Sequence, residues 1–180
     1  MDATAGWEKL TSPVHAGGYG VTSSRVIIYG QSIGSGPSTY LASTPALGGS
    51  AAALILHSGV MSLIRVILPL ERTLFVDPFP NIERIPKVNI PVAIIHGDQD
   101  EMVPFQHGQA LHAAAPVKLP PLWLRGAGHN DVPMFPEYYQ YLSTTVKSLA
   151  EGGGVSGARG GGGGGTVAAA GGPTPSEMRR

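Results

Sequence analysis

The sequence predicts an α/β protein with a mostly parallel β-sheet and helices on both of its faces. Short apolar runs of strand length alternate along the chain with longer segments of helical length. Residues 51–57 and 91–96 are apolar almost throughout and do not alternate with polar residues. Such runs are typical of parallel strands that helices cover on both faces, so the two observations agree.

The first part of the chain predicts a helix, a strand and a second helix. Residues 2–10 carry apolar side chains at helical spacing ahead of a proline, which predicts a short helix. Residues 25–29 are β-branched and aromatic and predict the first strand, which we expect to end at Gly30. A helix of small residues is expected over 32–43, with Pro37 near its first turn.

The rest of the predicted domain continues the alternation. After the strands at 51–57 and 91–96, residues 105–115 predict a helix, 121–124 a fourth short strand and 138–149 a final helix. Strand, helix, strand and helix in this order imply a doubly wound parallel sheet.

Residues 59–89 interrupt this order with a long excursion that contains four prolines, Pro69, Pro78, Pro80 and Pro86. Two interpretations remain open for this segment. It is either a lid that faces the substrate or a surface loop with a short helix and no function of its own.

The C-terminal segment differs from the rest in composition. Residues 152–180 are rich in Gly, Ala and Ser and have no aromatic side chain. Such a segment cannot bury enough apolar surface to offset its ordering entropy, so we expect a disordered tail. One domain, residues 1–151, precedes it.

Charge and composition exclude several classes of partner. Twelve Lys and Arg balance twelve Asp and Glu, so the basic excess that favours nucleic acid or an anionic membrane is missing. The absence of Cys excludes disulfides, thiolate zinc sites and a Cys nucleophile, and we expect neither a metal nor a cofactor. No secretory signal or transmembrane segment is predicted, and a cytoplasmic location is expected.

The segment Gly30-Gln31-Ser32-Ile33-Gly34 matches the G-x-S-x-G nucleophile elbow. The bare pattern is weak in a chain with 26 glycines. Its context strengthens it, because an apolar strand precedes it and a predicted helix follows it. Ser32 is therefore the candidate nucleophile, with Gly30 and Gly34 permitting the sharp turn.

A serine hydroxyl needs an imidazole base, and that base needs a carboxylate to orient it. Asp98, Asp100 and Glu101 all follow the strand at 91–96, and spacing does not choose among them. Asp98 has a second interpretation as a turn residue and Glu101 as a solvated one.

His129 is the best candidate for the base. It ends a Gly-rich turn after the fourth strand and completes the order Ser, acid, His that is expected of α/β hydrolases. His57 and His96 adjoin apolar strands and suit structural roles instead. The remaining histidines are on a predicted helix or before a loop, namely His107, His112 and His15.

Longer motifs extend this pattern over residues 24–149. They are Tyr29-Gly30-Gln31-Ser32-Ile33-Gly34, Ile55-Leu56-His57-Ser58 with Met61-Ser62, Asp77-Pro78-Phe79-Pro80-Asn81-Ile82, Pro91 to Gly97 with Asp100-Glu101, and Gly126-Ala127-Gly128-His129-Asn130-Asp131. In these motifs the chain resembles the alpha/beta hydrolase domain-containing protein 17 family of depalmitoylating serine hydrolases.

The resemblance implies an α/β-hydrolase fold and the cleavage of palmitoyl thioesters on acylated protein substrates. It implies Ser32 as nucleophile, Asp100 as the orienting acid and His129 as the base, with the backbone N–H of Ile33 meeting the oxyanion. An acyl groove lined by apolar residues of the excursion is a further expectation, although ordinary packing explains them equally well. These residues are Met61, Leu63, Ile64 and Val66.

The sequence also departs from the family pattern. Residues 2–10 resemble the helix just before the elbow strand, so the first strands and the His-Gly oxyanion loop have no counterpart here. The elbow strand is then expected at a sheet edge. The family's N-terminal cysteines are absent too, so peripheral association with the cytoplasmic face of membranes is expected only if an upstream segment is acylated.

Two alternatives stay open for the function. The same triad would serve an esterase, a lipase or a serine aminopeptidase, because the fold does not choose the substrate. The other alternative is a non-catalytic fragment that binds a partner along its exposed sheet edge.

Overall fold

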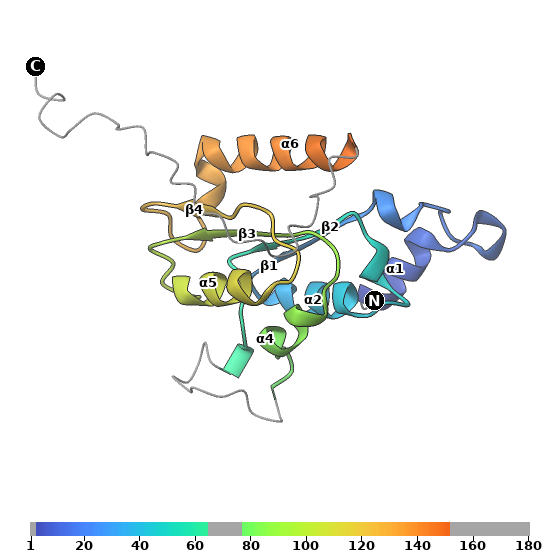
Figure 1. Cartoon of the computed structure of the whole chain (residues 1–180), viewed down its shortest axis with the longest axis horizontal. Helices are drawn as coiled ribbons and strands as arrows, with labels where there is room; N and C mark the ends of the chain where they lie inside the picture. The colour runs from blue at the N-terminus through green and yellow to red at the C-terminus, as the bar shows by residue number, and fades with distance from the viewer. Residues whose placement is uncertain (1–2, 65–76, 152–180) are drawn as a thin grey trace, which may run out of the picture.

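The computed structural model describes residues 3–64 and 77–151. In this part of the chain, a four-stranded parallel sheet runs in the order β1-β2-β3-β4 (Figure 1). The strands are β1 (Ile27–Gln31), β2 (Ala53–His57), β3 (Val92–Gly97) and β4 (Leu122–Leu124). The predicted fold class is confirmed.

Helices cover both faces of the sheet, as predicted. They are α1 (Ala3–Thr11), α2 (Ser35–Ser43), α4 (Asn81–Arg84), α5 (Phe105–Ala114) and α6 (Pro136–Ala150). In Figure 1, α2, α4 and α5 lie on one side of the sheet and α6 on the other. Among the described residues, no helix combines the length and the apolarity that crossing a bilayer requires.

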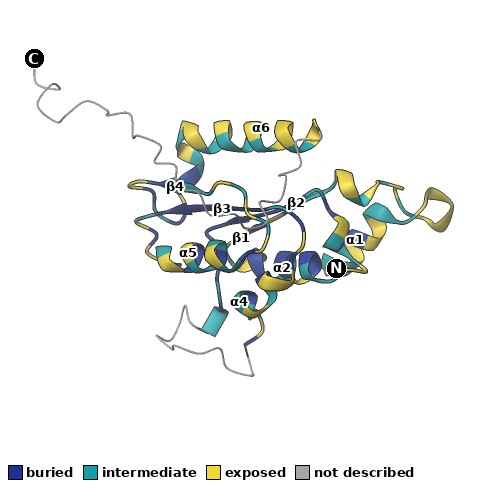
Figure 2. Cartoon of the chain, viewed as in Figure 1, coloured by how far each residue is buried: buried dark blue, intermediate teal, exposed yellow. Residues whose placement is uncertain are grey.

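The two faces of the sheet bury separate cores. Leu54 and Leu56 of β2 pack toward α2 and α5, whereas Ile55 between them packs toward Tyr138 and Leu142 of α6. Every residue of β2 and β3 is buried (Figure 2). This double coverage explains why these two strands do not alternate apolar with polar residues.

Several boundaries differ from the predicted ones by two or three residues. The first strand was expected at 25–29 but is Ile27–Gln31, because parallel pairing of Gly30 and Gln31 with Leu56 and His57 extends it. The helix expected to begin at Ser32 begins at Ser35, after a 3₁₀ turn. The last helix begins earlier than expected, with Pro136 in its first turn.

The excursion is only partly within the described residues. Its last part forms α4 and a 3₁₀ turn, Ile85–Lys87, and α4 packs against α2. Asn81 fixes this contact, since its side-chain N–H group donates to Ser35 Oγ at 3.2 Å and to the Val60 carbonyl at 2.8 Å. The predicted tail and residue Val66 lie outside the described residues.

Candidate active site

Ser32 follows directly on β1 in a sharp strand-to-helix turn. Its φ is 50°, in the left-handed region that non-glycine residues rarely adopt. Backbone strain at a single exposed turn is common at functional sites. The turn thus sets the Ser32 hydroxyl at the carboxyl end of the sheet, where ligands of α/β proteins bind.

The two glycines of the elbow are not equivalent. A β-carbon at Gly30 would lie 2.6 Å from Ser38 Oγ and 2.7 Å from the Gly34 carbonyl oxygen, so the turn has no room for one. A β-carbon at Gly34 would meet nothing within 4 Å, and the φ of Gly34 is −62°. The described turn therefore leaves no room for a side chain at position 30, whereas position 34 has room for one.

Three side chains from three loops form one hydrogen-bonded chain. His129 Nε2 lies 3.0 Å from Ser32 Oγ, and His129 Nδ1 lies 2.8 Å from Oδ2 and 3.0 Å from Oδ1 of Asp100. A carboxylate only accepts hydrogen bonds, so Nδ1 carries the proton and Nε2 accepts from the hydroxyl. The loops follow β1, β3 and β4, whose carboxyl ends meet at the same edge because the strands are parallel.

The carboxylate of Asp100 is buried and well supplied with donors. Its Oδ1 accepts the backbone N–H groups of Val103 at 2.7 Å and Met102 at 3.0 Å. Burial alone would raise the pKa of Asp100, but the hydrogen bonds from Val103 and His129, with the nearby Ser58 hydroxyl, hold it below its usual value. Asp100 is therefore ionised at neutral pH, as an orienting acid must be.

The structure separates the three acids that spacing leaves open. Asp98 Oδ1 accepts the backbone N–H of Gly126 at 2.7 Å and so holds the turn after β4. Glu101 Oε2 accepts the backbone N–H of His129 at 3.4 Å. Only Asp100 of the three contacts the His129 imidazole. The geometry assigns Asp98 to the turn, which was one of its two expected interpretations.

The other histidines of the strands have structural partners. His57 is buried, and its Nδ1 lies 2.6 Å from the Tyr29 hydroxyl, which in turn lies 3.0 Å from the hydroxyl of Tyr138. Burial lowers the pKa of His57 to about 4, and the field of His129 adds to this. His96 Nε2 lies 2.9 Å from the Val103 carbonyl oxygen and 3.3 Å from Asp100 Oδ2.

Ser58 and His96 also lie near Asp100, and the sequence did not predict this. Both residues stand at strand ends beside the candidate triad, and this position was the only available signal. For the expected acyl groove, Met61, Leu63 and Ile64 are half-buried, and Met61 packs against the core beneath α2 and α5. Ordinary packing explains Met61.

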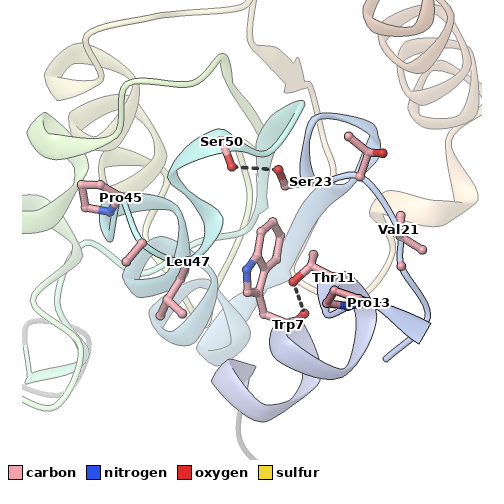
Figure 3. A pocket seen from close by; sticks show the side chains of 11 residues that line it. Trp7, Thr11, Pro13, Val21, Ser23, Pro45, Leu47 and Ser50 are labelled. Carbon is pink, nitrogen blue, oxygen red and sulfur yellow. Dashed lines mark hydrogen bonds between the residues drawn. The ribbon is translucent and has the colours of Figure 1, made fainter. Parts of the chain in front are cut away.

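A cavity of about 620 Å³ lies elsewhere in the molecule, and Figure 3 shows the side chains that line it. Trp7, Ser23 and Ser50 are among its lining residues, and Ser50 donates to Ser23 at 2.9 Å. Ser23 and Ser50 precede β1 and β2, so this cavity is at the amino ends of the strands, opposite Ser32. Among the described residues, no group of three or more His, Asp or Glu is arranged to hold a metal ion.

Known proteins resemble this chain in sequence. It is 44% identical over 142 residues to alpha/beta hydrolase domain-containing protein 17C of Xenopus tropicalis, which covers 78% of this chain and 43% of the relative. The human 17C protein is 42% identical over 142 residues, 78% of this chain and 40% of that protein. The chain thus spans less than half the length of these relatives. No protein-family model matches it.

Solved structures resemble the fold. An esterase from Rhodococcus sp. ECU1013 superposes with a TM-score of 0.55 at 18% identity, covering 82% of this chain and 74% of the esterase. A truncated carbohydrate esterase from gut microbiota gives 0.56 at 17% identity, covering 74% of this chain and 62% of that one. With its parallel sheet and its helices on both faces, the chain has part of an α/β-hydrolase fold and is a homologue of part of the alpha/beta hydrolase domain-containing protein 17 proteins.

Proposed function

We propose that the chain carries the catalytic triad of a serine hydrolase, with Ser32 as nucleophile, His129 as base and Asp100 as orienting acid. One observation carries the proposal, namely the continuous hydrogen-bonded chain from Ser32 Oγ through both nitrogens of His129 to Asp100. This is the geometry by which a triad is recognised on any fold.

The mechanism follows from this geometry. His129 Nε2 takes the proton of Ser32 while Oγ attacks the substrate carbonyl, and an acyl–serine bond forms as the leaving group departs with that proton. Water then attacks the acyl–enzyme with His129 again as base, and Ser32 is released. Asp100 keeps the Nδ1–H tautomer and stabilises the imidazolium that forms in each step.

The tetrahedral intermediate carries a negative oxygen that needs donors. The backbone N–H of Ile33 is the first, because it belongs to the residue that follows the nucleophile. An oxyanion hole of this type uses a second donor from another loop, and loss of one donor costs about 2.7 to 4 kcal/mol. If no second donor is supplied, we expect the rate of hydrolysis by this chain to fall by the factor that this free energy corresponds to.

The proposed substrates are palmitoyl thioesters on acylated cytoplasmic proteins. The support is the resemblance to the protein 17 family, to whose members the chain is 42 to 44% identical. A thioester suits a serine nucleophile because its thiol is a better leaving group than the alcohol of an ester. Other esters compete as substrates, since similar folds occur in proteins named as esterases.

The test begins with fluorophosphonate labelling of the purified chain, measured by intact mass. We expect one label on the wild type and none on Ser32→Ala. Ser43→Ala should be labelled like the wild type, because the Ser43 hydroxyl donates to the Tyr40 carbonyl and has no histidine partner among the described residues. Circular dichroism establishes that each variant is folded. A folded wild type that takes no label contradicts the proposal.

A second assay addresses the substrate. Peptides that carry palmitate on cysteine or on serine differ only in the scissile bond. Faster release from cysteine supports the thioesterase assignment, and equal or faster release from serine supports an esterase instead. Ser32→Ala should abolish both reactions.

A further inference from the structure

Two short turns lie side by side at the carboxyl ends of β1 and β2. The strands pair up to Gln31 and His57, and Ser32 and Ser58 follow these two residues directly. The φ of Ser32 is 50° and that of Ser58 is 46°, and within the described part of the chain no other non-glycine residue has a positive φ. A backbone in this region is strained and persists only where the surrounding contacts hold it.

A hydrogen bond joins the far ends of the two turns. Ser35 begins α2, and its Oγ accepts the backbone N–H of Val60 at 3.1 Å. A β-carbon at Gly59 would lie 3.3 Å from the β-carbon of Ser35, so the two backbones are also close. The two turns are therefore tied to each other twice, by strand pairing at one end and by this hydrogen bond at the other.

Asn81 of α4 donates to both partners of this hydrogen bond. Its Nδ2 lies 2.8 Å from the Val60 carbonyl oxygen and 3.2 Å from Ser35 Oγ. A carbonyl oxygen only accepts, so the NH₂ side of the amide faces Val60, and each of its two N–H groups has one acceptor. Asn81 and Ser35 are completely buried. Solvent therefore does not replace a partner that either of them loses.

A second contact from the same segment supports the first turn of α2. A β-carbon at Gly36 would overlap Cδ1 of Phe79, so the Phe79 ring packs directly against the helix backbone. The backbone N–H of Phe79 in turn donates to Asp77 Oδ1 at 2.9 Å. Residues 77–81 are thus fixed against the helix that follows Ser32.

We propose that Asn81 is a positioning residue for Ser32, and that it holds the strained turn by donating to Ser35 and to Val60. The inference rests on the proposed function of Ser32. The turn Ser32–Gly34 lies between two fixed ends, the paired strand and the first residue of α2. Loosening the second end lets the φ of Ser32 relax toward an ordinary value.

Such a relaxation affects the contact on which the reaction depends. Ser32 Oγ lies 3.0 Å from His129 Nε2, and a hydrogen bond weakens steeply when its distance or angle departs from this geometry. Asn81 does not touch the reacting atoms in this arrangement. Its effect is expected in the rate of the chemical step and not in the affinity for a substrate.

The chain offers a control for the general loss of a hydrogen bond to the backbone. The hydroxyl of Tyr141 on α6 donates to the Pro120 carbonyl at 2.6 Å, and it joins a helix to a loop as Asn81 does. Pro120 precedes β4, so this contact is at the amino ends of the strands, opposite Ser32. Tyr141→Phe should therefore lower stability without changing the turn.

The first measurement is the time course of fluorophosphonate labelling by intact mass at several probe concentrations, with the folded fraction from circular dichroism. A misplacement of about 1 Å costs about 10²-fold in rate, and for a partial relaxation in Asn81→Leu we expect about a tenfold loss in the limiting rate constant per folded molecule. The probe concentration for half the limiting rate should not change. Tyr141→Phe should keep the wild-type rate constant.

The second measurement tests whether Asn81 acts through Ser35. Ser35→Ala removes only the oxygen that the two N–H groups share, and it should also slow labelling. Since both variants loosen the same end of the turn, the double variant should lose less than the product of the two single losses. Losses that multiply overturn the proposal. If Asn81→Leu does not fold, Ser35→Ala decides alone, and a wild-type rate constant in that variant overturns the proposal.

The outcomes separate the two proposals. A folded wild type that takes no label contradicts the proposed function. A wild type that is labelled, with Asn81→Leu labelled at the same rate per folded molecule, contradicts only the role of Asn81. Equal losses of rate constant in Asn81→Leu and Tyr141→Phe show a general effect of stability and also overturn the positioning role.

Discussion

Gly30 lies so close to Ser38 that a β-carbon at position 30 would be 2.6 Å from the Ser38 hydroxyl oxygen. This contact joins the end of β1 to α2, and Ser32 lies between these two elements along the chain. It shows that the elbow depends on close packing between strand and helix as well as on the φ of 50° at Ser32. The two glycines of the G-x-S-x-G motif can therefore be separated by experiment.

Gly30→Ala should abolish or greatly slow fluorophosphonate labelling of Ser32, because the added carbon forces the Gly34 carbonyl or Ser38 to move. Gly34→Ala should be labelled at close to the wild-type rate, since a β-carbon there meets nothing within 4 Å. Labelling rates and circular dichroism of both variants check this. An equal loss of labelling rate in the two variants would show that Gly34 is also needed when a substrate is bound.

Asp100 and Asp98 stand two residues apart and should respond very differently to loss of charge. Asp100→Asn should lower the labelling rate by about 10⁴-fold, because an amide no longer holds His129 in the Nδ1–H tautomer. Asp98→Asn keeps an oxygen that accepts from the Gly126 N–H and should remain close to the wild type. A large loss in Asp98→Asn alone would move the acid role to that residue.

The local sequence pattern predicts some features of this fold and not others. The strands of the sheet were predictable because continuous apolar runs follow from burial on both faces. The end of β1 was not, since Gly30 and Gln31 have little strand preference and are held by pairing with Leu56 and His57. Asp98 and Asp100 occupy one turn, and only the positions of Gly126 and His129 in space distinguish them.

The hydroxyl of Tyr29 connects β1, β2 and α6 through His57 and Tyr138. Tyr29→Phe leaves the buried His57 Nδ1 without this partner and should lower the free energy of unfolding by about 2 kcal/mol. Tyr40→Phe is the matched control, because Tyr40 is similarly exposed and contacts Arg84 through its ring, which phenylalanine keeps. Urea unfolding of both variants measures the difference, and similar values for the two would contradict a role for the Tyr29 hydroxyl.

The buried His57 should make the chain less stable in mild acid. Its pKa is about 4 in the folded state against 6.5 when exposed, so the unfolded chain binds more protons between these values. Stability is therefore fully present above pH 6.5 and is lost as the pH falls toward 4, by about 3 kcal/mol from this group. His96, whose pKa burial also lowers, acts in the same direction.

Urea unfolding at several pH values between 7 and 4 measures this loss. His57→Asn removes the titrating ring while keeping a polar group near the Tyr29 hydroxyl, so its stability should fall less steeply over the same range. The Asp100 carboxylate does not account for the difference, because its lowered pKa affects stability only at more acidic pH. An equally steep fall in His57→Asn would mean that another group, with His96 the first candidate, takes up the proton that destabilises the fold.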